Sequence, residues 1–195
     1  MPKLDLRADR TAILCMDYQT GIVAGIGDDV ADNILPLAAK TLDAARSAGI
    51  MVIYIHVGFR DGFPEISQNN AMFSALANDP LRQKMFEPSM TDIHPAVAPN
   101  DGDIVITKRR VSAFYGTELD IVLRAGGIDT LIMFGIATSG VVLSTLTDAI
   151  DADYRVTVIK DLCADSDVKL HTALLDFYAK RGDVITADGS IDHLR

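Results

Sequence analysis

The chain has 195 residues, two cysteines and a net charge of −9 at neutral pH. This length is typical of one domain with a continuous core, so we expect a single domain over residues 1–195. The acidic balance argues against nucleic acid or an anionic membrane as a partner, because both require clustered Lys and Arg. No apolar stretch approaches the ~18 residues of a membrane span, and segment 1–10 is polar. We therefore expect a cytoplasmic protein.

Apolar runs alternate with helical segments along the chain. Strands are expected at residues 12–16, 51–56, 104–107, 130–134, 155–160 and 183–186, and helices at 30–48, 117–125, 140–152 and 168–181. This alternation is typical of βαβ units. It predicts an α/β fold with a doubly wound, mostly parallel six-stranded sheet and helices on both faces, in a Rossmann-like three-layer arrangement.

Residues 58–100 interrupt this rhythm. They hold most of the prolines and many polar residues, with one short helix expected near 80–85. An insertion of this length in an α/β domain is more often functional than a linker. We expect it to form a pocket wall or a subunit contact.

Charged residues follow two of the expected strands, where parallel sheets bind ligands. Asp17 ends the first strand among apolar neighbours, where burial would raise its pKa and suit it to acid or base catalysis. Lys108 ends the third strand and could pair with Asp17 or polarise a substrate oxygen. Arg109 and Arg110 follow it and could bind an anionic substrate. The alternatives are a turn or cap residue for Asp17 and a solvated charge run for the cations.

Small residues link the fourth strand to the next helix. Free backbone N–H groups and the helix dipole at such a turn favour an anion or a developing oxyanion. Ala137, Thr138 and Gly140 are therefore candidate oxyanion or substrate-binding residues.

Four segments carry a resemblance to one family. They are Asp17-x-Gln19, then Lys108 with Ser112-Ala113-Phe114 and Thr117, then Gly126–Thr130 leading to Gly135-x-x-Thr138, and finally Tyr154–Val156 with Asp161–Asp165. In order and on the expected elements, they resemble the isochorismatase-like (cysteine hydrolase) family. The resemblance implies a doubly wound α/β fold and an Asp–Lys–Cys triad in the amidase members. It also implies a cis peptide before Ala137 and a homo-oligomer, either a dimer or a tetramer.

The triad carries over only in part. Asp17 and Lys108 match, with Gln19 and Phe114 as further substrate-site candidates, but the position of the catalytic cysteine is Val141. Valine has no nucleophilic atom, so a thioester at this position is excluded. Ser139 is expected to cap the helix, and Ser144 to pack within it, because no histidine is expected near this turn to activate a serine.

We expect no metal and no cofactor. The nicotinamidase branch of the family binds a metal through an Asp-x-His…His cluster after the second strand, and only His56 is present there. A single histidine at a strand end is more often satisfied locally than a ligand. The two cysteines, Cys15 and Cys163, lack metal or disulfide spacing and are expected to be buried, inert thiols.

Two classes of function follow. The first is a hydrolase of a small metabolite that uses the Asp17/Lys108 pair without a cysteine nucleophile, on a vinyl ether, an ester or a C–N bond. Isochorismatases have glycine at the cysteine position and are understood to use the strand-end aspartate as an acid. Because this chain differs from them in residues 137–139, we expect a substrate other than isochorismate. The second class is a non-catalytic small-molecule-binding or scaffold protein that kept the fold.

Overall fold

The six strands form one sheet in which every neighbouring pair is parallel, in the order β3-β2-β1-β4-β5-β6. The strands are β1 (Thr11–Met16), β2 (Met51–Val57), β3 (Ile104–Lys108), β4 (Thr130–Gly135), β5 (Arg155–Ile159) and β6 (Asp183–Ile185). The computed structural model describes residues 6–193. Residues 1–5 and 194–195 of the expected domain, and with them half of the polar segment 1–10, lie outside the described part.

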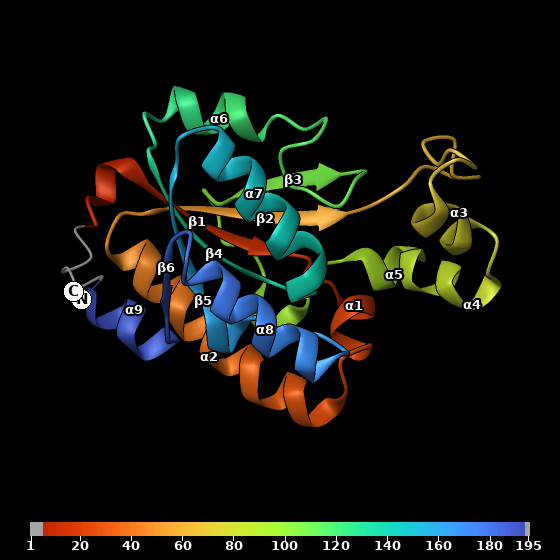
Figure 1. Cartoon of the computed structure of the whole chain (residues 1–195), viewed down its shortest axis with the longest axis horizontal. Helices are drawn as coiled ribbons and strands as arrows, with labels where there is room; N and C mark the ends of the chain where they lie inside the picture. Colours follow the sequence, from red (N-terminus) through yellow and green to blue (C-terminus); the bar gives the residue numbers. More distant parts are fainter. Residues whose placement is uncertain (1–5, 194–195) are drawn as a thin grey trace.

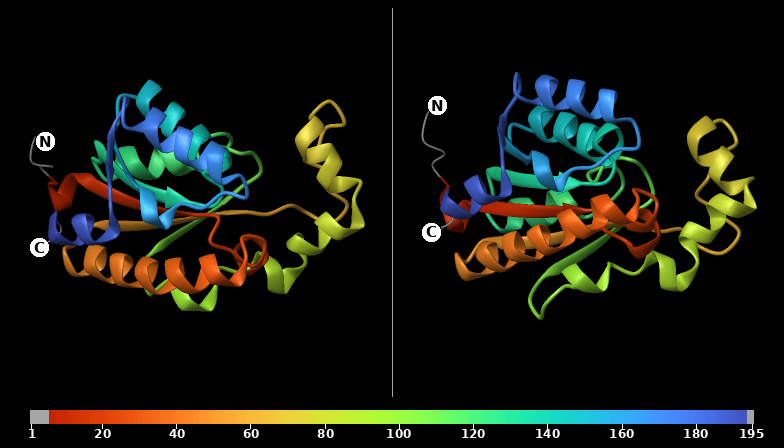
Figure 2. Two further views of the ribbon diagram at one scale, coloured as in Figure 1. Left: turned by 60° about the horizontal axis from the view of Figure 1, so that its bottom comes forward. Right: turned by 90° about the horizontal axis from the view of Figure 1, so that it is seen from below.

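Helices cover both faces of this sheet (Figure 1). They are α1 (Thr20–Ala24), α2 (Asp28–Ser47), α3 (Ala71–Ala77), α4 (Pro80–Gln83), α5 (Pro88–Thr91), α6 (Leu119–Ala125), α7 (Leu143–Asp151), α8 (Val168–Tyr178) and α9 (Ala187–His193). Helices α2 and α9 lie on one face, and α6, α7 and α8 lie on the other (Figure 2). The predicted doubly wound, parallel α/β fold is therefore confirmed.

Burial explains why the strands carry continuous apolar runs. All six residues of β1 and of β4 are buried, because helices cover both sides of the central strands. Helix α2 instead has buried residues at intervals of three or four positions. They include Ile34, Leu35, Ala38 and Leu42. This spacing is that of an amphipathic helix with one face on the core. None of the helices described between residues 6 and 193 is both long and apolar enough to cross a membrane.

Residues 58–91 form an arm that projects from the body (Figures 1 and 2). Helices α3, α4 and α5 lie in it, with the expected short helix seen as α4 followed by a turn at Lys84–Phe86. Phe59 packs edge-on against Phe63, Phe73 and Phe86, with ring centroids 5.9, 5.6 and 5.3 Å away. The arm therefore has a small aromatic core of its own.

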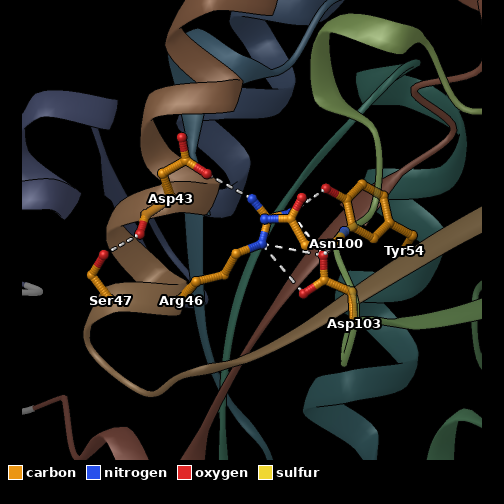
Figure 3. Close-up of polar contacts among 6 residues, drawn as sticks. All are labelled: Asp43, Arg46, Ser47, Tyr54, Asn100 and Asp103. Carbon is orange, nitrogen blue, oxygen red and sulfur yellow. Dashed lines mark hydrogen bonds and ion pairs between the residues drawn. The ribbon is translucent and has the colours of Figure 1, made fainter.

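A partly buried polar cluster joins the end of α2 to the residue that precedes β3 (Figure 3). The Arg46 guanidinium donates to the Asp103 carboxylate at 2.7 Å, to the Tyr54 hydroxyl at 2.8 Å and to Asp43 at 2.8 Å. The Asp103 side chain is only 6% exposed. Arg46 is therefore the counter-charge for a carboxylate that water barely reaches.

We expect Arg46→Met to lower the free energy of unfolding by about 2–3 kcal/mol, because it leaves the buried Asp103 charge unpaired. Urea denaturation measures this. Arg124→Met removes an exposed pair with Asp120 on α6 and serves as the control, with an expected loss under about 0.5 kcal/mol. Equal losses for the two variants would contradict a structural role for the Arg46 cluster.

Candidate active site

The carboxyl ends of β1 and β3 bring Asp17 and Lys108 together. The Lys108 ammonium lies 2.9 Å from Asp17 Oδ2, and the two side chains are 3% and 7% exposed. Lys108 also donates to the carbonyl of Arg110 at 3.2 Å. Asp17 has a positive φ of 57°, and its N–H donates to the carbonyl of Ile55 on β2. This region is also where the strand order reverses between β1 and β4, the usual ligand position in such sheets.

Asp17 has one oxygen without a partner. Its Oδ1 is buried and makes no hydrogen bond to any of the residues that the structure describes. Burial raises the pKa of Asp17 above its ordinary value, and the Lys108 ammonium and the His56 ring offset part of this rise. A buried carboxyl with a raised pKa and a free oxygen is suited to proton transfer.

The turn after β4 has the geometry that the resemblance implied. The Ile136–Ala137 peptide is cis, and a π-helical turn over Thr138–Val142 leads into α7. The Gly140 N–H donates to the carbonyl of Ala137 at 3.1 Å. The turn therefore starts at the end of β4, next to the end of β1.

Side chains from distant segments hold this turn in place. The Thr138 hydroxyl lies 2.8 Å from Nδ1 of His171 on α8, and the Thr138 carbonyl accepts from the Tyr178 hydroxyl at 2.7 Å. The Asp165 carboxylate accepts from the Ser139 N–H at 2.7 Å. Partial burial works against ionisation of Asp165, but hydrogen bonds from Ser139 and Asp167 outweigh it and lower the pKa.

Two expectations for this turn are wrong. A histidine does lie beside it, because α8 returns along the sheet and carries His171 to Thr138. No sequence signal placed it there, since the two residues are 33 positions apart. Ser139 is not a helix cap but lies within the turn, where its N–H is held by Asp165. Thr138 is fully buried, and its hydroxyl already contacts the Ala164 carbonyl and His171. A substrate therefore does not reach this hydroxyl, and we infer that His171 positions the turn.

Val141, where the sequence resemblance places the catalytic cysteine, is buried in the turn. Its side chain is 2% exposed. A Cβ atom placed on Gly135 would lie 3.1 Å from Val141 Cγ1 and 2.8 Å from the Met16 carbonyl. Val141 therefore points back toward the junction of β1 and β4, and Gly135 lets the turn approach closely.

Gln19 is fully buried and tied to the backbone of the arm. Its amide nitrogen donates to the carbonyls of Val57 and Thr91, at 2.9 and 3.0 Å, and its amide oxygen accepts from the Val57 N–H at 2.7 Å. Val57 precedes the arm, and Thr91 ends it. Because both amide N–H groups are used, we infer that Gln19 positions the arm rather than contacting a substrate.

The two arginines after Lys108 also contact the arm. Arg109 pairs with the Glu65 carboxylate at 3.3 Å, and Arg110 donates to the Glu65 carbonyl at 3.1 Å.

Phe114 lies elsewhere. Its ring packs on Tyr154, with 5.9 Å between the centroids, and Tyr154 directly precedes β5, at the amino end of the parallel sheet and away from the carboxyl end that holds Asp17 and Lys108. The structure therefore does not bring Phe114 to the Asp17/Lys108 pair.

His56 is satisfied locally. Its Nε2 lies 2.6 Å from the Thr107 hydroxyl, and its Nδ1 lies 3.5 Å from the Thr91 carbonyl. Among residues 6–193, no group of three or more His, Cys, Asp and Glu side chains converges as metal ligands would.

The sheet and the flanking helices define a doubly wound α/β protein, with the Asp17/Lys108 pair at the carboxyl ends of its strands. The isochorismatase domain profile matches residues 11–189. The chain is 34% identical over 176 residues to a ureidoacrylate amidohydrolase of Rhizobium rhizogenes, covering 81% of this chain and 72% of that one. The chain therefore belongs to the isochorismatase family of hydrolases.

Solved structures agree with this assignment. An isochorismatase family protein from Burkholderia thailandensis superimposes with a TM-score of 0.85 at 27% identity, covering 97% of each chain. The N-carbamoylsarcosine amidase from Thermoplasma acidophilum gives a TM-score of 0.75 at 26% identity, covering 92% of this chain and 97% of that one.

Both cysteines are buried, as predicted. Burial raises the pKa of Cys15, and it raises that of Cys163 to about 12. Because only the thiolate reacts, we expect iodoacetamide at pH 8 to label neither residue in the folded protein and to leave turnover unchanged. Mass spectrometry measures the labelling, and unfolding in guanidinium is the positive control. Rapid inactivation that tracks one labelled cysteine would contradict this expectation.

Proposed function

We propose that the protein hydrolyses a small metabolite by acid-assisted chemistry, with Asp17 as the proton donor and water as the nucleophile. The observation that carries the proposal is the free oxygen of Asp17, which is buried beside Lys108 at the switch point of the sheet. Val141 has no nucleophilic atom, so the scheme uses water as the direct nucleophile. The bond is a vinyl ether, an ester or a C–N bond.

Each residue has one role in this scheme. Protonated Asp17 gives its proton from Oδ1 to the substrate, water adds to the activated carbon, and one proton of that water returns to Asp17. The adduct then collapses: the scissile C–O or C–N bond breaks, a carbonyl group forms, and the leaving group takes up the proton of the adduct's hydroxyl. The Lys108 ammonium stabilises the carboxylate that forms between these steps. The N–H groups of Thr138 and Gly140 already donate to the carbonyls of Ala164 and Ala137, at 2.9 and 3.1 Å, so in this turn the role of facing a developing charge is assigned to Ala137.

The setting of this activity is also a proposal. The substrate is a small molecule, no cofactor is required, and the protein works as a cytoplasmic homo-oligomer. The arm is the part of the chain that we expect to close the pocket or contact another subunit. Size-exclusion chromatography with light scattering tests the oligomer.

A second candidate, a non-catalytic binding protein, is favoured by one observation. Val141 is nearly inaccessible and packs toward Gly135, so the position of the missing nucleophile is filled by an apolar side chain. Burying the Asp17/Lys108 pair, however, costs desolvation free energy that stability alone does not justify. This favours the catalytic candidate.

A hydrolysis panel in ¹⁸O-labelled water separates the two candidates. It contains simple amides, ureido compounds, esters and isochorismate. The proposal predicts turnover of at least one compound, with one labelled oxygen in the product and no mass adduct on the intact protein. An acyl adduct would contradict attack by water, and silence across the panel would favour the binding protein.

A further inference from the structure

The arm presents an exposed apolar side chain between two charges. Helices α3 and α4 form its outer part, while α5 lies closer to the sheet (Figure 1). Leu81 on α4 is 74% exposed, more than any other large apolar side chain that the structure describes. Asp79 and Arg82 flank it, are themselves exposed and pair with each other at 3.4 Å. The arm tip, residues 79–82, therefore offers a leucine with one charge of each sign beside it.

A cleft with a volume of about 440 Å³ lies between the arm and the body. Phe73 of α3, Tyr115 of the loop after β3 and Leu143 of α7 give it apolar walls. Tyr115 is 68% exposed, although it is a large aromatic residue. The cleft is therefore a hollow with apolar surface that the rest of the chain leaves in contact with solvent.

The same cleft holds two charges without counter-charges. The Arg110 guanidinium donates to two neutral acceptors, the carbonyls of Arg109 at 2.7 Å and Glu65 at 3.1 Å. The Asp148 carboxylate accepts from the Ser112 hydroxyl at 2.5 Å. Neither charge forms an ion pair with a residue in the range 6–193. Both lie among the cleft-lining residues, so a bound partner that brings one cation and one carboxylate would complete them.

The arm tip and the cleft are complementary in polarity and in charge. Leu81 matches the apolar walls. Asp79 is opposite in sign to Arg110, and Arg82 is opposite in sign to Asp148. Electrostatic complementarity of this kind fixes the register of an interface and suppresses other partners. One chain therefore carries both halves of a possible contact.

The tip cannot enter the cleft of its own chain. Helix α3 forms one wall of that cleft, only two residues separate α3 from α4, and the two helices pack together. Turning α4 into the cleft would break this packing. The tip of a second copy has no such restriction, because the arm projects from its body (Figures 1 and 2). In a two-fold dimer each copy supplies one tip and one cleft, so the contact forms twice.

We propose that two copies of the chain exchange their arms, with the arm tip of each copy bound in the cleft of the other. Leu81 lies against the partner's Tyr115, Asp79 pairs with the partner's Arg110, and Arg82 pairs with the partner's Asp148. The interface rests on the homo-oligomer of the proposed function. It does not rest on the hydrolytic activity.

The exchanged arm contacts the loop that holds Lys108. The Arg110 carbonyl accepts from the Lys108 ammonium at 3.2 Å. A carboxylate that pairs with Arg110 therefore restrains the segment next to the Asp17/Lys108 pair. Each subunit in this way contributes a residue beside the candidate active site of the other.

Sedimentation equilibrium and light scattering on Leu81→Asp test the apolar contact. We expect a dimer or a larger assembly for the wild type, and a dissociation constant raised about 30-fold or more by Leu81→Asp, because a charge then enters an apolar pocket at the interface. Ile121→Asp changes an equally exposed residue on α6 and is the control, with an expected change within about 3-fold. A monomeric wild type, or equal dissociation constants for the two variants, would overturn the proposal.

Charge reversal tests the register of the interface. Arg82→Glu and Asp148→Lys should each raise the dissociation constant about 10-fold or more, because like charges then face each other. The double variant should return to within about 3-fold of the wild type, since opposite signs face each other again. Arg124→Glu, on exposed α6, should not rescue Asp148→Lys. A double variant no better than Asp148→Lys alone, with folding confirmed by circular dichroism, would refute the pairing.

The hydrolysis panel on the same proteins separates this proposal from the catalytic one. A wild-type dimer that depends on Leu81 but turns over no compound would sink the catalytic proposal alone. Turnover by a wild type whose assembly does not depend on Leu81 would sink the arm exchange alone.

Discussion

Asp17→Asn is expected to lower kcat/KM by about 10²–10⁴-fold, the usual contribution of a general acid. Asparagine has the shape of aspartate but cannot transfer the proton. It also tolerates the left-handed backbone at this position, where φ is 57°. The loss of activity would therefore report on the proton and not on backbone strain, which alanine at the same position would add.

Asp120→Asn is the matched control for this variant. Asp120 lies on α6, where its exposed carboxylate pairs with Arg124. We expect its kcat/KM to stay within about 2-fold of the wild type, since surface pairs contribute little. Circular dichroism confirms the folding of both variants. A wild-type rate for folded Asp17→Asn would exclude Asp17 as the acid.

Lys108→Met should reduce turnover, because no ammonium then stabilises the Asp17 carboxylate that forms in the reaction. It should also destabilise the protein by about 3–5 kcal/mol at a pH at which Asp17 is ionised, because that charge is then buried and unpaired. Urea denaturation measures the loss. Lys169→Met, an exposed lysine on α8, is the control and should change stability by less than about 0.5 kcal/mol.

The effect of Lys108→Met should shrink as the pH falls. The pKa of Asp17 is already raised in the folded protein, and removal of the cation raises it further. A folded-state pKa above the unfolded value gives stability that is present at low pH and is lost as the pH rises through the folded pKa. The double variant Asp17→Asn/Lys108→Met should recover most of the loss, because no buried charge remains. The pair would not be coupled if the stability loss of the double variant equalled the sum of the two single losses and did not change with pH.

The sequence predicted the sheet well because its strands are buried on both faces. Continuous apolar runs such as 130–134 match β4 to within a residue, and the alternation with helices implied parallel strands. The convergence of Asp17 and Lys108 followed from the same logic, since both end parallel strands of one sheet. Which strands lie between them could not be read from the chain.

The parts that the sequence missed depend on long-range contacts. The expected helix at 140–152 begins as a π-helical turn, because Asp165 and His171 hold residues 138 and 139 from another segment. Hydrophobic periodicity carries no information about such contacts. Gln19 and Phe114 matched the motif. The motif could not show that the Gln19 amide is used by the backbone of the arm, or that the Phe114 ring packs on Tyr154 at the amino end of β5.

The central claim is that Asp17 gives a proton in the reaction, and the pH dependence of kcat/KM tests it most directly when compared with the pKa of Asp17 measured by ¹³C NMR. The Asp17→Asn spectrum assigns the resonance. The account predicts an NMR pKa above the ordinary value for aspartate and a kcat/KM that falls as the pH rises through that same pKa. A profile that stays flat there, or that rises with pH, would contradict the role of Asp17 as the acid.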